Sequence, residues 1–163
     1  MLYLLFFAPL VLLLVAIQAT VLNQMTLAGG HLDIIVISLV MLTLYGRYEL
    51  ALLAGVLMAP FIDALSGMPL GVSVLPLLSV IFLAHGGGKN MFGARLGWPV
   101  IIIFISSLLA GLITLAELAL LGWQMPWTDL MLRVLAPTAL LNGMAAIAIY
   151  LPIIIFGERR GLH

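Results

Sequence analysis

Residues 51–71, which read ALLAGVLMAPFIDALSGMPLG, are the most informative stretch of the sequence. Residues four apart share one face of a helix. One such face of the stretch carries Ala51, Gly55, Ala59, Asp63, Gly67 and Gly71. All but Asp63 are small, and small residues let membrane helices approach each other closely. The stretch therefore predicts a closely packed membrane helix with one acid near its end, where an ionisable group marks a candidate functional site.

The composition of the whole chain identifies an integral membrane protein. The 163 residues are 65% hydrophobic and 7% charged, whereas soluble domains carry about 25% charged residues. The chain has no cysteine, and its three histidines lie far apart without the spacing of metal ligands. The net charge is zero, so the chain lacks the excess of basic residues that is typical of nucleic-acid-binding proteins. We therefore expect a lipid bilayer as the surroundings, with no metal, no cofactor and no nucleic acid bound.

Six apolar segments are candidates for crossing the membrane, for which about 20 residues are needed. The predicted spans are about 2–22, 32–45, 48–66, 70–85, 98–122 and 131–156. The second and fourth are short, and fusing the second with the third while dropping the fourth would leave four spans. That alternative places Arg47 and Glu49 in mid-membrane, so we reject it. The sequence predicts an all-α, single-domain bundle of six transmembrane helices.

The basic residues predict how this bundle is oriented. With six spans, the two termini share a side. That side also receives most of the basic residues, which are Arg47, Lys89, Arg95, Arg159 and Arg160. Only Arg133 falls on the other side. Because basic residues gather on the cytoplasmic side of membrane proteins, both termini are predicted to be cytoplasmic.

Five polar residues are predicted in or near the outer half of the membrane and could meet at the mouth of a central cavity. Asp33 opens the second span, while Asp63 and Glu117 lie about one turn from the outer ends of theirs. Arg133 lies at the same depth, so a ring of helices would place it among three acids. Asn142 lies in the middle of the sixth span and could line the same cavity.

Each of these residues also has a structural interpretation. Asp33 can cap the second helix at its positive end. Glu117 and Arg133 can reach water from near the interface or form a structural pair. For Asn142, a single interhelical hydrogen bond is the preferred interpretation. For Asp63, function or obligatory pairing is preferred over simple exposure to water, because the other residues on its helix face are all small.

The residues give no support to an enzyme. Asp33 and Asp63 are the only candidates for a carboxylate dyad, and their surroundings lack the motifs of membrane lipoprotein signal peptidases. A Ser–His nucleophile pair is also unsupported, because His85 is predicted on the cytoplasmic side and the candidate serines on the outer side. We expect a protein without catalytic residues.

The third span and its turn resemble a known family. The likeness rests on Gly55 and on the block Asp63-Ala64-Leu65-Ser66-Gly67, followed by Pro69-Leu70-Gly71, with Asp33 opening the second span after a glycine-containing turn. These residues resemble MreD, the rod-shape-determining membrane protein of bacteria. The sharp likeness covers residues 30–71, while length and six-span layout agree over the whole chain. One departure is Leu32, where the family often has proline before the acid.

The resemblance implies a non-enzymatic scaffold of the cell-elongation and peptidoglycan-synthesis machinery in the bacterial cytoplasmic membrane. The implied partner is MreC, within a complex that includes MreB filaments, RodA and a class B penicillin-binding protein. The ridge of Ala51, Gly55 and Ala59 would seat either a neighbouring helix of the bundle or the MreC transmembrane helix. The turn from Gly67 to Gly71 would meet the MreC juxtamembrane segment.

Two alternatives remain beside the scaffold. The MreD fold is thought to be shared with the S components of energy-coupling-factor vitamin transporters, which bind a substrate in an outward-facing cavity. The chain could thus be such a substrate-binding subunit. It could also be a structural subunit of another membrane complex that binds a different partner helix.

Overall fold

The computed structural model describes residues 2–22, 26–27, 29–88 and 97–159, with side chains described from residue 9 to residue 151 of these ranges. Nearly all of them are helical, which confirms the all-α prediction. The helices are α1 (Leu2–Thr20), α2 (Ile34–Leu44), α3 (Tyr48–Ser66), α4 (Val74–Gly88), α5 (Gly97–Leu120), α6 (Trp127–Leu130), the π-helical turn η2 (Met131–Leu135) and α7 (Ala136–Arg159). A short antiparallel pair, β1 (Thr26–Leu27) and β2 (Gly30–His31), precedes α2.

Each predicted span contains a helix, and three of these helices are long and apolar enough to cross a membrane. They are α3, α5 and the continuous helical stretch Trp127–Leu151. The described parts of α1, α2 and α4 are apolar but shorter. The chain is therefore a helical membrane protein. Lys89, Arg95 and Arg160, on which the predicted orientation depends, lie outside the described residues, as does the side chain of Arg159.

The ends of α2 and α3 have local causes in the sequence. Gly46 adopts a φ of 76° between the two helices, a conformation that suits glycine, so α2 and α3 are separate as predicted. Gly67 ends α3 in the left-handed conformation, and its N–H donates to the carbonyl of Asp63. The fourth helix begins at Val74, later than the predicted residue 70, because residues 67–73 form the connection from α3.

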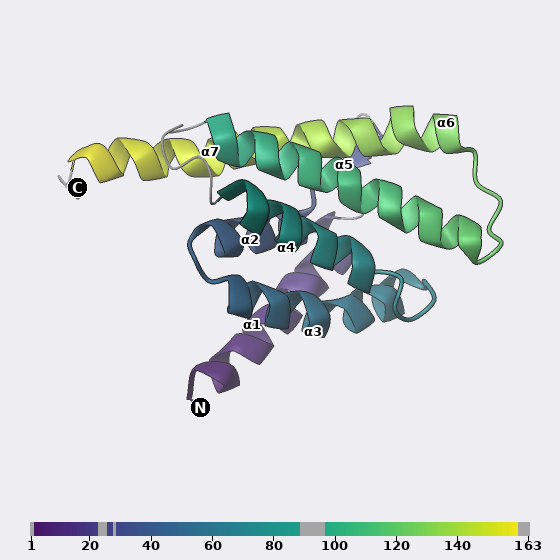
Figure 1. Cartoon of the computed structure of the whole chain (residues 1–163), viewed down its shortest axis with the longest axis horizontal. Coiled ribbons are helices and arrows are strands. Elements are labelled where there is room, and N and C mark those ends of the chain that lie inside the picture. The colour runs from purple at the N-terminus through teal and green to yellow at the C-terminus, as the bar shows by residue number, and fades with distance from the viewer. Residues whose placement is uncertain (1, 23–25, 28, 89–96, 160–163) are drawn as a thin grey trace.

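The helices form two groups that pack against each other (Figure 1). The long helices α5 and α7 run side by side, and α4 packs on α5. The helices α2, α3 and α4 contact one another, and α1 packs against α3 and α2. The start of α1, the end of α7 and the α2–α3 turn lie toward the left in Figure 1, while the α3–α4 and α5–α6 connections lie toward the right.

The small-residue face predicted on α3 lies inside the bundle. Ala51 and Ala59 are fully buried. A Cβ atom built on Gly55 would lie 2.9 Å from Cδ1 of Ile81 and 3.8 Å from Cβ of Leu77, both on α4. Of the two expected occupants of the ridge, the structure therefore shows a neighbouring helix of the same chain. A partner helix has no access to this face.

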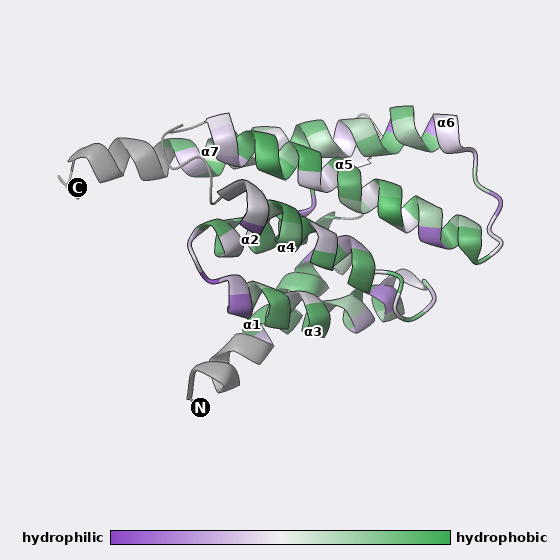
Figure 2. Cartoon of the chain, viewed as in Figure 1, coloured by the Kyte–Doolittle hydropathy of each residue, from purple (hydrophilic) through white to green (hydrophobic). Residues whose placement is uncertain are grey.

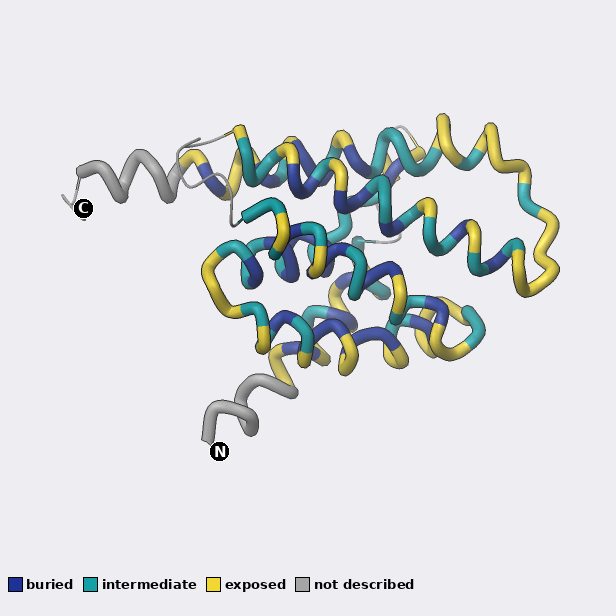
Figure 3. The backbone as a smooth tube through the Cα atoms, viewed as in Figure 1, coloured by how far each residue is buried: buried dark blue, intermediate teal, exposed yellow. Residues whose placement is uncertain are grey.

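The outer surface of the bundle carries many large apolar side chains. Hydrophobic residues cover both the inward and the outward faces of α3, α5 and α7 (Figure 2), while buried residues form stripes only along the inward faces (Figure 3). Leu132 and Met144, for example, are 71% and 66% exposed. Helices that are apolar on all sides suit a lipid environment, where the solvent is itself hydrocarbon.

Candidate functional site

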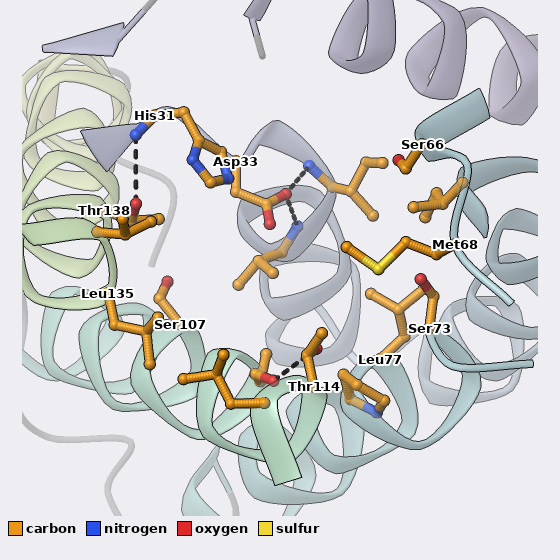
Figure 4. Close-up of a pocket in the computed structure, with 18 of the residues that line it drawn as sticks. His31, Asp33, Ser66, Met68, Ser73, Leu77, Ser107, Thr114, Leu135 and Thr138 are labelled. Atoms are coloured by element: carbon orange, nitrogen blue, oxygen red, sulfur yellow. Dashed lines mark hydrogen bonds between the residues drawn. The ribbon is translucent and has the colours of Figure 1, made fainter. Parts of the chain in front are cut away.

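A cavity of about 580 Å³ lies between the start of α2 and the helices α4, α5 and α7 (Figure 4). The length of α2 explains it: 11 residues span about 16 Å, whereas the 24 residues of α5 span about 36 Å. The volume falls in the range of small-molecule sites, about 300–1,000 Å³. Polar residues interrupt its apolar lining at Gln18, His31, Asp33, Ser66, Ser73, Ser107, Thr114, Thr138 and Asn142.

Asp33 caps α2 and borders the cavity. Its Oδ1 accepts hydrogen bonds from the backbone N–H groups of Ile35 and Val36, each at 3.1 Å. The helix-cap interpretation of Asp33 is therefore confirmed. In the part of the chain that the structure describes, the second carboxylate oxygen, Oδ2, receives no hydrogen bond, and the side chain borders the cavity (Figure 4).

Asn142 joins three elements at the same place. Its Oδ1 accepts from the backbone N–H of Asp33 at 2.8 Å, and its Nδ2 donates to Oγ of Ser107 at 2.9 Å. The side chain is fully buried, so both bonds are made away from water. The preferred prediction of an interhelical hydrogen bond is thus confirmed, because Asn142 links α7 to α5. The alternative, that it lines a cavity, also holds.

Gln18 and Thr138 bond to further backbone groups before and at the start of α2. The Nε2 of Gln18 donates to the carbonyl of Leu32 at 3.0 Å, and its Oε1 accepts from the N–H of Ile34 at 3.0 Å. Thr138 Oγ1 accepts from the N–H of His31 at 3.2 Å. Non-helical backbone at membrane depth needs such partners, because lipid offers none. Sequence reasoning missed Gln18, whose one signal is an amide within an apolar helix.

Gly29 and Gly30 allow the chain before α2 to lie directly on η2 and the start of α7. A Cβ on Gly30 would lie 2.5 Å from the backbone nitrogen of Thr138, and a Cβ on Gly29 would collide with the carbonyl oxygen of Arg133. Pro137 has no N–H with which to bond that carbonyl four residues back. Pro137 therefore removes the α-helical donor for the Arg133 carbonyl, which is the group that Gly29 approaches closely.

Asp63 pairs with the α3–α4 connection and lies outside the cavity lining. Its carboxylate accepts from the backbone N–H of Gly71 at 2.7 Å and from both N–H and Oγ of Ser73, at 3.1 and 2.5 Å. The side chain has no exposed surface. Asp63 is therefore paired rather than exposed to water, and its partners are Ser73 and the backbone of the connection. Its partner, Ser73, was not recognised from the sequence, although a serine directly before a helix is a common capping residue.

The structure corrects the predicted grouping of Arg133 with three acids. The Arg133 side chain is 79% exposed, and its Nε lies 3.5 Å from Oδ1 of Asp129, one turn earlier. An exposed guanidinium keeps its hydration and loses little by pairing locally, whereas burial among acids would cost desolvation. Glu117 is half-buried on α5, and its Oε2 is buried without a hydrogen bond from the described residues. The predicted cluster thus separates into a cavity pair, Asp33 and Asn142, a second pair, Asp63 and Glu117, which interact electrostatically, and the exposed Arg133.

No protein-family model matches the chain, and no curated protein or solved structure matches it either. Within the described ranges, no three His, Asp or Glu side chains are grouped so as to hold a metal ion. The chemistry available in the cavity is that of one carboxylate, one imidazole and several hydroxyl and amide groups.

Proposed function

We propose that this protein is a non-enzymatic scaffold subunit of the bacterial cell-elongation machinery, of the MreD type, that binds MreC in the cytoplasmic membrane. The proposal starts from the block between Asp63 and Gly71 that resembles MreD. In this proposal six helices cross the membrane and both termini are cytoplasmic, so the α3–α4 connection lies on the outer side. MreB, RodA and a class B penicillin-binding protein would then associate as further members of the complex.

The observation that carries this proposal is the geometry of the α3–α4 connection. Asp63 holds both Gly71 and Ser73, while Gly67 and Gly71 adopt φ values of 67° and 102° that suit glycine. Leu70, between the two glycines, is 76% exposed. A connection fixed in this way presents an apolar side chain at little further cost in conformational entropy, which favours binding of a partner segment.

The outward face of α3 supplies a surface that leads to this connection. It carries exposed apolar residues at every fourth position, which are Leu53, Leu57, Phe61 and Leu65. Because the Ala51–Gly55–Ala59 ridge packs on α4, we place the MreC transmembrane helix on this outward face instead. A single helix lying along it would bring its juxtamembrane segment to Leu70.

Co-purification with the MreC-like protein of the same genome tests the proposal. The full chain is co-expressed with that protein, extracted in mild detergent and isolated through a tag on the partner. Leu70→Ser is expected to weaken the complex by about 1–3 kcal/mol, the value of a buried leucine side chain. Leu120→Ser is the matched control, because Leu120 is 88% exposed at the end of α5. Absence of a wild-type complex, or equal loss in both variants, contradicts the proposal.

The cavity favours a second candidate function, a ligand-binding subunit similar to an S component. Its volume of about 580 Å³ and its mainly apolar lining are typical of small-molecule sites. This function predicts a small molecule that stays with the purified protein in native mass spectra. A ligand-free protein that binds MreC would support the scaffold alone.

A further inference from the structure

We propose that the cavity binds an amphipathic molecule with a protonated amine, which donates to Oδ2 of Asp33 while its apolar body lies along α5. The inference rests on the cavity as a ligand site and so deepens the second candidate function. It does not depend on MreC binding. It follows from the unused oxygen of Asp33, from the charges around it and from the hydrogen bonds that most of the other polar groups make within the protein.

Asp33 has unused capacity to bind a ligand in the cavity. A carboxylate offers about four acceptor positions over two oxygens. The two capping bonds from Ile35 and Val36 both reach Oδ1. Figure 4 shows the carboxylate at the edge of the open space, with Oδ2 free of any hydrogen bond from the described residues. A carboxylate in a mainly apolar cavity is stabilised strongly by a charged N–H donor.

The charges around the cavity favour a cation over an anion. The residues that line it include Asp33 but no Lys or Arg from the described ranges. Arg133, at the nearby π-helical turn, points to the surface and pairs with Asp129. The positive end of α2, which would attract an anion, is already occupied by the Asp33 carboxylate. His31 borders the same space, where it interacts electrostatically with Asp33 and can serve as a second polar contact (Figure 4).

Most of the remaining hydroxyl groups already form hydrogen bonds within the protein, so a ligand does not need to supply partners for them. Ser107 and Thr114 on α5 donate to the carbonyls of Ile103 and Ala110, four residues back. Ser73 is held by Asp63. Apolar side chains fill the space between these groups, including Leu115 and Leu118 of α5. The part of the ligand beyond the amine is therefore expected to be apolar.

Two sources provide this chemistry, namely the ethanolamine headgroup of a lipid and a soluble amine. The full chain is placed in phosphatidylcholine nanodiscs, since the choline headgroup has no N–H donor, and its Tm is measured with 2-phenylethylamine or with the uncharged 2-phenylethanol. We expect the amine alone to raise Tm saturably, by roughly 5 °C. In a second arm, phosphatidylethanolamine replaces phosphatidylcholine. A rise there that also abolishes the response to the soluble amine assigns the site to the lipid headgroup.

Asp33→Asn separates binding from folding, because asparagine is also a good helix cap. We expect this variant to lose both responses. Asp129→Asn, which removes an exposed acid paired with Arg133, is expected to keep them. Thr114→Leu is a second variant that keeps the carboxylate but fills the cavity opposite Asp33, and it should also lose the responses (Figure 4).

The results that would overturn the inference are specific. They are equal stabilisation by 2-phenylethanol, an undiminished response in Asp33→Asn or Thr114→Leu, or no response to either amine source. If the wild-type protein retains a small molecule without an amine in native mass spectra, the ligand-binding function is supported and the proposal that the ligand carries an amine is contradicted. If no molecule is retained and neither amine source raises Tm, both the ligand-binding function and the amine proposal are contradicted.

Discussion

The backbone N–H of Asp33 donates to Oδ1 of Asn142 at 2.8 Å, across 109 residues of sequence. This bond fixes the point at which α2 begins, because Asp33 is also the cap of that helix. Asn142 is held in turn by Ser107 on α5. The position of the cavity therefore depends on a short chain of hydrogen bonds between α2, α7 and α5.

Replacing Asn142 by leucine is expected to destabilise the fold by about 1–3 kcal/mol, because it leaves the N–H of Asp33 buried without an acceptor. Thermal unfolding in one fixed detergent measures the change. Ser107→Ala is the control for the second bond alone, and it should cost less, since Asn142 can still accept from Asp33. An unchanged Tm for Asn142→Leu would contradict the structure at this point.

The pairing of Asp63 with Ser73 predicts energetic coupling between the two residues. Asp63→Ala and Ser73→Ala should each destabilise the α3–α4 connection, and the double variant should lose less than the sum of the two. For residues in one hydrogen-bond network the expected coupling is about 0.5–3 kcal/mol. Hydrogen exchange at the amides of residues 67–73 reports the loosening directly. Strict additivity would show that the two side chains act independently.

Gly55→Leu should weaken the fold itself by about 1–3 kcal/mol through overpacking, whether or not a partner is present. The reason is the close approach of Ile81, whose Cδ1 would lie 2.9 Å from a Cβ at position 55. Gly86→Leu is the matched control, since a Cβ there meets nothing within 4 Å. Thermal unfolding of the isolated chain distinguishes the two. Loss of MreC binding with an unchanged Tm would instead place a partner on this face.

Gly30→Ala is expected to be more damaging than Gly55→Ala. At position 30 the added methyl group would meet backbone atoms of Pro137 and Thr138 at 2.7 and 2.5 Å, which cannot move aside like a side chain. At position 55 it meets the flexible end of Ile81. Comparison of folded yield and Tm for the two variants tests this order. The reverse order would mean that β2 does not lie against α7 as described.

The sequence alone predicted the helices well because their breaks are local. Gly46 and Gly67 mark the limits of α3, whose predicted and observed range is 48–66 in both cases. The cap formed by Asp33 was one of the two interpretations open for that residue, since an acid before an apolar run commonly caps a helix. The pair of β1 and β2 was not foreseen, because nothing in residues 26–31 alternates in the way of a strand.

The grouping of side chains was harder to predict because it depends on how each helix is rotated. The depth of Arg133 follows from its place in the sequence, but the face on which it lies does not. The π-helical turn η2 contains Arg133 and widens the helix there, so positions counted with the α-helical period no longer indicate one face. The partners of Gln18 are backbone groups at the start of α2, and Ser73, the partner of Asp63, lies in an irregular connection, so neither residue has a periodic signal.

The shortness of α2 has a consequence for how such proteins can diverge. One additional helical turn before Asp33 would extend α2 by about 5.4 Å into the cavity. The lipid-facing surfaces of α3, α5 and α7 would stay as they are. An insertion of three or four residues before Asp33 would therefore narrow the cavity, so a purely architectural subunit and a receptor for small molecules can share the same exterior.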